Sequence, residues 1–212
     1  MKMVTALRVG KGRQKRVNLF LDGKFVFSLE AEVVAEKKLH VGQELTETQV
    51  EALARAERFH CCLRAATRYL SYRLRSESEL RGRLRRHGYD RDIVEAAVVR
   101  LKEQGLVDDA AFARFWKDNR QAFRPRSQRL TGLELRRKGV SREIIDQVVG
   151  DIEDDDSAYR AVLGRARKLN LSDYENFRSR LGGFLRRRGF GYEVIGHTLE
   201  RVWRERGEGG LE

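Results

Sequence analysis

A short motif occurs three times along the chain, at intervals of 51 and 50 residues. Each copy is a leucine, three basic or potentially basic residues and a glycine: Leu84–Gly88, Leu135–Gly139 and Leu185–Gly189. Mostly apolar residues follow every glycine at the spacing of one face of an amphipathic helix. Recurrence at this period predicts tandem helical units, each packed mainly against its neighbours.

Every repeat is predicted to hold three helices. The expected first helices cover about 61–74, 109–123 and 157–169, the second end near 87, 138 and 188, and the third cover about 90–104, 141–152 and 192–204. The expected domains are an N-terminal extension at 1–58, three-helix repeats at 59–107, 108–153 and 154–206, and a frayed tail at 207–212. The predicted fold class is therefore mainly all-α, with three tandem three-helix repeats in an elongated curved array.

The N-terminal extension has a different pattern. Two runs of alternating apolar residues, Val17–Leu21 and Phe25–Leu29, flank the dipeptide Asp22-Gly23. Asp-Gly between such runs is a strong signal for a two-residue hairpin turn. The sequence predicts a small β-hairpin or three-stranded sheet, a short helix over about 30–39 and a turn at 40–43.

A long helical pattern follows the extension. Thr46 is expected to cap it, because Gln49 three residues later completes a capping box. The pattern continues from Glu47 to about Arg75, which is long for one globular helix, so we expect a break near 59–63.

The charge is strongly basic and unevenly distributed. The formal net charge is +12, and residues 61–150 hold 21 basic and 12 acidic side chains, a surplus of nine. A cationic surface of this kind attracts polyanions through long-range fields and counterion release. We expect an anionic partner, although basic surplus also aids solubility.

The basic triplets before the three glycines allow two interpretations. Glycine in the left-handed conformation ends a helix, and cations in the last turn suit the negative end of the helix dipole. The second interpretation is a ladder of anion contacts, to which the loop arginines around Pro125 also belong. The candidate DNA- or filament-binding residues are Arg73, Arg75, Arg85, Arg86, Arg124, Arg126, Arg129, Arg136, Arg137, Lys138, Arg186, Arg187 and Arg188.

Packing and helix capping account for the remaining reactive side chains. The adjacent Cys61 and Cys62 suit packing better than a disulfide or a metal site. The acidic runs at 108–109 and 154–156 fall where helices start, so we expect them to cap those helices. The aromatic residues of helix 109–123, together with Tyr69 and Tyr72, are expected mainly in the core rather than as base-stacking platforms.

No combination of residues makes a credible active site, so we expect a binding protein rather than an enzyme. The glycine-rich fragments fit neither a phosphate-binding loop nor a dinucleotide motif. No catalytic residue, cofactor or metal is predicted. No apolar run approaches the ~20 residues of a membrane helix, and the first ten residues lack a signal peptide's apolar stretch, so a cytoplasmic location is expected.

Several stretches together resemble the RecX family of regulatory proteins. These stretches are Asn18–Phe25, Tyr69–Ser76, Glu79-Leu80, Leu84, Gly88, Leu101, Gly105-Leu106, Asp108-Asp109, Phe112-Ala113, Glu134-Leu135 and Lys138–Val140. The third repeat matches only through Arg188–Phe190 and the apolar spacing after it.

The resemblance implies tandem three-helix repeats and a modulator, usually an inhibitor, of RecA recombinase. Such proteins bind along the groove of the RecA–DNA filament, suppress its ATPase and strand exchange, and can bind single- and double-stranded DNA directly. The partners expected from it are the RecA filament and DNA, with no membrane, for a chain acting as a monomer. A stand-alone, sequence-tolerant DNA-binding or architectural protein is the alternative function, since three-helix units also suit helix-turn-helix proteins.

Overall fold

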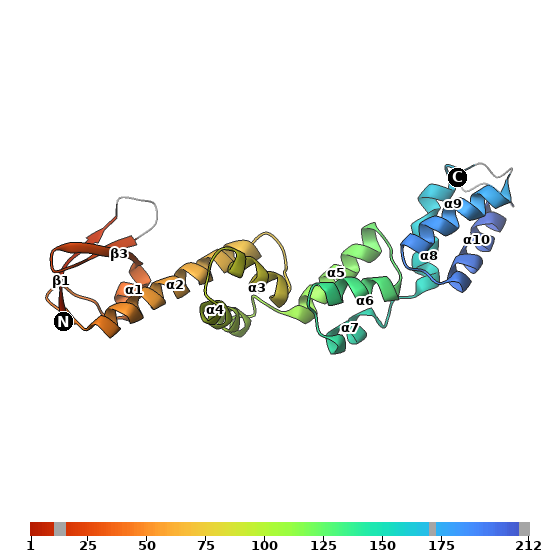
Figure 1. Cartoon of the computed structure of the whole chain (residues 1–212). Helices are drawn as coiled ribbons and strands as arrows, with labels where there is room; N and C mark the ends of the chain where they lie inside the picture. The colour runs from red at the N-terminus through yellow and green to blue at the C-terminus, as the bar shows by residue number, and fades with distance from the viewer. Residues whose placement is uncertain (11–15, 170–172, 208–212) are drawn as a thin grey trace. The chain divides into compact units, whose positions relative to one another are not determined.

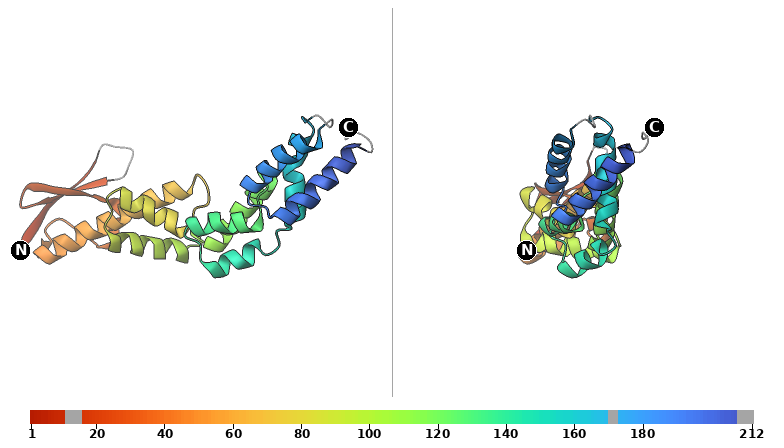
Figure 2. Two further views of the ribbon diagram at one scale, coloured as in Figure 1. Left: turned by 45° about the vertical axis from the view of Figure 1, so that its right-hand side comes forward. Right: turned by 90° about the vertical axis from the view of Figure 1, so that its right-hand side faces the viewer.

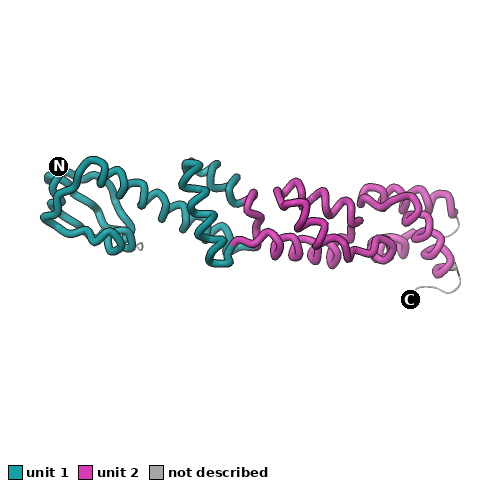
Figure 3. The backbone as a smooth tube through the Cα atoms, turned by 90° about the horizontal axis from the view of Figure 1, so that it is seen from below, with its two compact units in different colours: residues 1–73, 80–106 teal, residues 74–79, 107–212 magenta. Residues whose placement is uncertain are grey.

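The computed structural model describes residues 1–10, 16–169 and 173–207 (Figure 1). The chain forms two compact bodies (Figure 3): an N-terminal body of residues 1–73 and 80–106, and a C-terminal body of residues 74–79 and 107–212. Most of the cationic run at 11–16 and of the expected tail at 207–212 lies outside the described residues. The elongated, curved arrangement of the repeats stays a prediction.

The N-terminal body begins with a small antiparallel sheet. Its strands are β1 (Lys2–Val9), β2 (Arg16–Leu21), β3 (Lys24–Glu30) and β4 (Glu44–Leu45), in the order β3-β2-β1-β4. Asp22 and Gly23 join β2 to β3, and their φ angles of 49° and 79° confirm the two-residue turn. The two-residue β4 was not predicted, because it is too short to show an alternating pattern.

A helix covers the apolar face of this sheet. Leu19, Leu21 and Leu29 are nearly fully buried and share a core with Leu53 of α2 (Glu47–Leu70). The short α1 (Ala31–Glu36) adds Val33 to that core. The predicted capping box starts α2, since Thr46 accepts a hydrogen bond from the Gln49 amide and its own amide donates to the Gln49 side chain.

The predicted break in α2 is wrong. The helix runs unbroken through residues 59–63, where the sequence offers neither proline nor glycine to interrupt it. Its two halves are buried in different places. Leu53 packs into the sheet core. Cys62 and Ala66 are buried further along α2, and α2 also packs against α4 (Arg91–Glu103).

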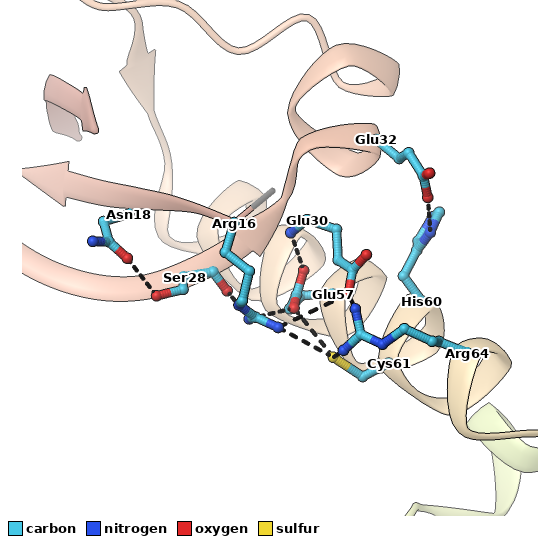
Figure 4. Close-up of polar contacts among 9 residues, drawn as sticks. All are labelled: Arg16, Asn18, Ser28, Glu30, Glu32, Glu57, His60, Cys61 and Arg64. Atoms are coloured by element: carbon cyan, nitrogen blue, oxygen red, sulfur yellow. Dashed lines mark hydrogen bonds and ion pairs between the residues drawn. The ribbon is translucent and has the colours of Figure 1, made fainter. Parts of the chain in front are cut away.

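A buried carboxylate joins α2 to the sheet (Figure 4). The Arg16 guanidinium of β2 donates to Glu57 Oε1 at 2.6 Å, and the Glu30 amide donates to Glu57 Oε2 at 2.7 Å. Arg16 also donates to the Ser28 carbonyl at 2.7 Å. Only 10% of the Glu57 side chain is exposed, so these bonds replace water that the carboxylate has lost.

Replacing Glu57 with glutamine is expected to lower the free energy of unfolding by about 2 kcal/mol. The variant loses charge-assisted hydrogen bonds and leaves the Arg16 guanidinium with only its longer ion pair, to Glu30 at 3.9 Å. Urea denaturation followed by far-UV circular dichroism measures the change. Glu51→Gln, at an exposed position of the same helix, is the control. Equal stability of the two variants would show that the buried carboxylate contributes nothing.

Three three-helix units follow one another after the sheet (Figures 1 and 2). The second half of α2, α3 (Glu77–Arg86) and α4 form the first unit, α5 (Asp109–Phe123), α6 (Gln128–Arg137) and α7 (Arg142–Val149) the second, and α8 (Asp154–Ala166), α9 (Tyr174–Arg187) and α10 (Tyr192–Gly207) the third. The motif leucines Leu84, Leu135 and Leu185 are at most 1% exposed. The threefold recurrence predicted from the sequence is confirmed in the helices. Among the described residues, no helix has the length and apolar character needed to cross a membrane.

Candidate nucleic-acid interface

The motif glycines end their helices as predicted. Gly88, Gly139 and Gly189 have φ angles of 84°, 79° and 89°, in the region that glycine adopts without steric cost. In each copy the amide after the glycine donates to the carbonyl of the motif leucine, as Val140 does to Leu135 at 3.2 Å. This pattern satisfies carbonyls that the end of the helix would leave unpaired. The capping interpretation is therefore confirmed for the glycines.

Two of the three glycines also allow close packing between neighbouring parts of the C-terminal body. A Cβ added to Gly139 would overlap the Cβ of Ser78, and one added to Gly189 would lie 2.6 Å from the Cβ of Leu130. A Cβ on Gly88 would meet no atom within 4 Å. The glycine is thus a cap in all three copies and a packing requirement in the second and third.

A buried serine lies at each of these two contacts. Ser76 and Ser127 are fully buried. The Ser76 hydroxyl donates to the Lys138 carbonyl at 2.6 Å, and the Ser127 amide donates to the Arg188 carbonyl at 3.1 Å. The backbone at the end of α6 is therefore bonded to the segment before α3, and the end of α9 to the segment before α6. We call these two contacts the serine junctions.

Aspartates from the following helices complete these junctions. The Glu77 amide donates to Asp109 Oδ1 at 2.8 Å, and the Gln128 amide donates to Asp154 Oδ1 at 2.7 Å. Asp108 caps its own helix through the amides at 110 and 111. Capping of its own helix is confirmed for Asp108, whereas α8 (Asp154–Ala166) begins without a side-chain capping bond. Asp109 and Asp154 each cap the second helix of the preceding repeat instead, which no pattern along the sequence could reveal. The third unit's first helix also starts at Asp154, three residues before the predicted Ser157.

In the second and third copies of the motif, the third basic residue belongs to the junction rather than to the open surface; His87 in the first copy is exposed. Lys138 Nζ donates to Glu79 Oε1 at 2.6 Å and lies 4.2 Å from the centre of the Trp116 ring. Its side chain is 20% exposed. Lys138 is therefore half-buried, unlike Arg136 and Arg137, because the serine junction draws it against the preceding segment.

Arg188 has the equivalent place in the third unit. It donates to the Pro125 carbonyl at 2.8 Å, and its guanidinium lies 4.5 Å from the centre of the Phe184 ring. Burial lowers the pKa of Arg188, and the nearby Arg126 and Arg165 add to the effect. Arg126 is held in the same region by an ion pair with Glu134, and burial lowers its pKa too.

The first two basic residues of every motif point to solvent. The exposed members of the candidate set are Arg85, Arg86, Arg124, Arg129, Arg136, Arg137, Arg186 and Arg187. The half-buried members are Arg73, Arg75, Arg126, Lys138 and Arg188. Among the described residues, neither Arg136 nor Arg137 forms an ion pair with an acidic side chain. Each unit therefore presents an exposed arginine pair at the same position of its second helix.

A groove between α6 and α7 adds to this surface in the second unit. It encloses about 450 Å³ and is lined by Arg129, Arg136 and Arg142. Arg142 forms an ion pair with Asp146 at 3.4 Å. Arg142 is not among the predicted site residues, because its position is basic in only two of the three copies: Arg91 is the equivalent in the first unit and Tyr192 in the third.

The aromatic residues expected in the core are only partly buried there. Phe112 is fully buried and Trp116 packs against the same core, as predicted. Tyr72, by contrast, is 72% exposed and Phe115 37% exposed. The core assignment is therefore wrong for Phe115 and for Tyr72. Tyr72 follows the last turn of α2 and is left uncovered by the described helices of its own body.

One cluster among the described residues has the donor types of a metal site. Ligand atoms of Glu30, Glu57 and Cys61 lie within 4.8 Å of one another. Two guanidinium groups, from Arg16 and Arg64, already pair with those carboxylates (Figure 4). These cations occupy the place that a metal ion would need, so the cluster is an ion-pair network. The cysteines are free thiols, and burial raises the pKa of Cys62 to about 11, which agrees with a packing role.

Three family descriptions match the chain in order. "Regulatory protein RecX N-terminal domain" matches residues 2–46, "RecX, first three-helix domain" residues 62–101, and "RecX, second three-helix domain" residues 108–149. The chain belongs to the RecX family. The basic ends of α3 and α6 lie within the matched RecX domains, whereas that of α9 lies outside the three matched stretches.

Similarity to individual RecX proteins extends over nearly the whole chain. A regulatory protein RecX of Clostridium botulinum (strain Eklund 17B, type B) is 29% identical over 208 residues, which is 95% of this chain and 97% of that protein. One of Lactobacillus gasseri is 29% identical over 211 residues, 98% of this chain and 78% of the relative. A crystal structure of a regulatory protein RecX superposes with a TM-score of 0.75 over 94% of this chain and all of that chain, at 24% identity. That likeness supports the fold.

Proposed function

We propose that this protein binds RecA–DNA filaments and inhibits their ATPase and strand-exchange activity, contacting DNA directly as it does so. Membership of a family of regulatory proteins carries the proposal. A regulator of this kind acts by binding, without a catalytic residue or a cofactor of its own, and it works as a monomer in the cytoplasm.

The exposed arginine pairs support the binding part of the proposal. Arg85-Arg86, Arg136-Arg137 and Arg186-Arg187 occupy equivalent helix ends and point to solvent. Contacts between guanidinium groups and phosphates depend on charge and not on base sequence. Such contacts suit a filament whose DNA has any sequence, and acidic protein surfaces would attract the same pairs.

Titration of RecA with this protein tests the regulatory activity. RecA is preassembled on single-stranded DNA, and ATP hydrolysis is followed while the protein is added. We expect hydrolysis to slow at substoichiometric ratios, because one bound molecule can affect several filament subunits. RecA without DNA serves as the background. Hydrolysis that stays constant over a wide titration contradicts the proposal.

A stand-alone DNA-binding role is the second candidate, favoured by the surplus of nine positive charges in residues 61–150. It requires tight binding to naked duplex DNA, with an affinity that falls steeply as salt rises. We expect naked duplex to bind more weakly than the RecA filament at the same salt concentration. The reverse order, together with unchanged ATP hydrolysis, would favour the second candidate.

A further inference from the structure

The N-terminal body contains a groove that the arginine pairs do not use. It lies between the second half of α2 and the end of α3, and it encloses about 690 Å³. Arg64, Arg68 and Tyr72 line it from α2 and the residues just after that helix, while Arg83 lines it from α3. We call this feature the tyrosine groove.

The charge of the tyrosine groove has one sign. Its lining includes three arginines and a histidine but no carboxylate. Arg64 pairs with Glu30, whereas Arg68 is exposed and pairs with no side chain among the described residues. The guanidinium of Arg83 lies 5.5 Å from the centre of the Tyr69 ring, so it is already positioned at the groove wall. Guanidinium groups arranged in this way suit an anion such as a phosphate.

The groove also presents an aromatic ring to solvent. Tyr72 is 72% exposed, although a large ring is usually covered in a folded protein. It lies in the turn that follows α2, and Arg64 and Arg68 of that helix line the same groove. Tyr69, which is half-buried, belongs to the same lining. An exposed ring beside an unpaired guanidinium thus offers stacking and charge together.

These features favour single-stranded nucleic acid as the ligand. An unstacked base can lie on a tyrosine ring while its phosphate meets an arginine, and this combination does not depend on sequence. Bases of a duplex are stacked on each other and cannot reach the ring. An acidic peptide would use the arginines but would leave Tyr72 without a matching group.

We propose that the tyrosine groove binds an unstacked base and its phosphate from single-stranded nucleic acid, with Tyr72 stacking on the base and Arg68 contacting the phosphate. This inference deepens the direct DNA binding included in the proposed function. It gives the first three-helix unit a binding site for single strands that is separate from the exposed arginine pairs.

Binding of labelled oligonucleotides in the absence of RecA tests the proposal. Fluorescence anisotropy compares oligo(dT) with an abasic strand of the same length, which has phosphates and no bases. Tyr72→Ala is expected to weaken oligo(dT) binding about tenfold and to leave binding of the abasic strand unchanged. Tyr72→Phe is expected to restore the affinity, because its ring still stacks.

Two further variants separate charge from stacking. Arg68→Gln is expected to weaken binding of both strands and to reduce the slope of log affinity against log salt by ~0.7, the value for one phosphate of a single strand. Tyr192→Ala removes another exposed tyrosine, 82% exposed on α10, and is expected to change neither affinity. Because Tyr72 and Tyr192 are both exposed, neither alanine variant should disturb folding.

Several results would overturn the assignment. Tyr72→Ala with wild-type affinity, or with an equal loss on the abasic strand, excludes base stacking in the groove. Tighter binding of poly-glutamate than of oligo(dT) assigns the groove to acidic peptides instead. If thymidine monophosphate displaces the labelled oligonucleotide as effectively as oligo(dT) does, at equal nucleotide concentration, the groove binds free nucleotides instead.

The RecA titration is independent of these assays. If RecA hydrolysis does not respond but Tyr72→Ala still loses oligonucleotide affinity, the proposed function fails and the groove stands.

Discussion

Replacing Gly139 with alanine is expected to lower the free energy of unfolding by about 3 kcal/mol. Two costs add. A non-glycine residue at a φ of 79° costs about 1–2 kcal/mol, and the new methyl group would overlap the Cβ of Ser78, which costs about 1–3 kcal/mol in a packed contact. Urea denaturation followed by far-UV circular dichroism measures the change.

Gly88→Ala is the matched control for that experiment. Gly88 has the same backbone conformation, with a φ of 84°, but no neighbouring atom lies within 4 Å of the added Cβ. The loss at this position should therefore be about 1 kcal/mol. The difference between the two variants isolates the packing role of the glycine. Equal losses would mean that the serine junction yields without cost and that helix capping alone accounts for the motif.

The second large effect concerns the exposed arginine pair of α6. Changing Arg136 and Arg137 together to glutamate is expected to weaken binding to RecA–DNA filaments about 100-fold at ~0.1 M salt, because two phosphate contacts become repulsive. Both side chains are exposed, so folding should remain near normal. Filament affinity measured at several salt concentrations should also show a smaller salt slope.

Two controls make this result specific. Arg91→Glu with Arg100→Glu changes the net charge by the same amount on α4, where both residues are exposed. An equal loss of affinity in that variant would mean that only net charge matters.

Lys138→Gln should affect stability and not filament affinity. It is expected to lower stability by about 1.5 kcal/mol, through loss of the bond to Glu79, and to leave the affinity of the folded protein nearly unchanged.

The helices could be predicted from the sequence because each carries its own local signals. The second unit shows this well. Its first helix was expected over 109–123 and is found there, since an aspartate cap precedes it and Pro125 follows it closely. The left-handed glycines were equally predictable, because a glycine directly after a basic last turn is typical of a helix that ends in that conformation.

What the sequence did not reveal depends on contacts between distant segments. Lys138 is 59 residues from Glu79, and Asp154 is 26 residues from the amide that it caps. Nothing in the local pattern distinguishes a lysine in a junction from an arginine in solvent. Exposure of Tyr72 was missed for the same reason, because helical spacing shows which residues share a face but not whether another element covers that face.

The uninterrupted course of α2 has a consequence for how this family can vary in length. The helix has 24 residues and is about 36 Å long at ~1.5 Å per residue. Glu57 faces the sheet while Cys62 faces the three-helix unit, so each half is bound to its own neighbours. One residue inserted between them would rotate the two halves by about 100° relative to each other. Insertions between them should therefore be tolerated only when they add close to a whole number of turns, and seven residues, nearly two turns, is the shortest close match. The number of residues between Glu57 and Cys62 thus fixes the rotation of one half of α2 relative to the other.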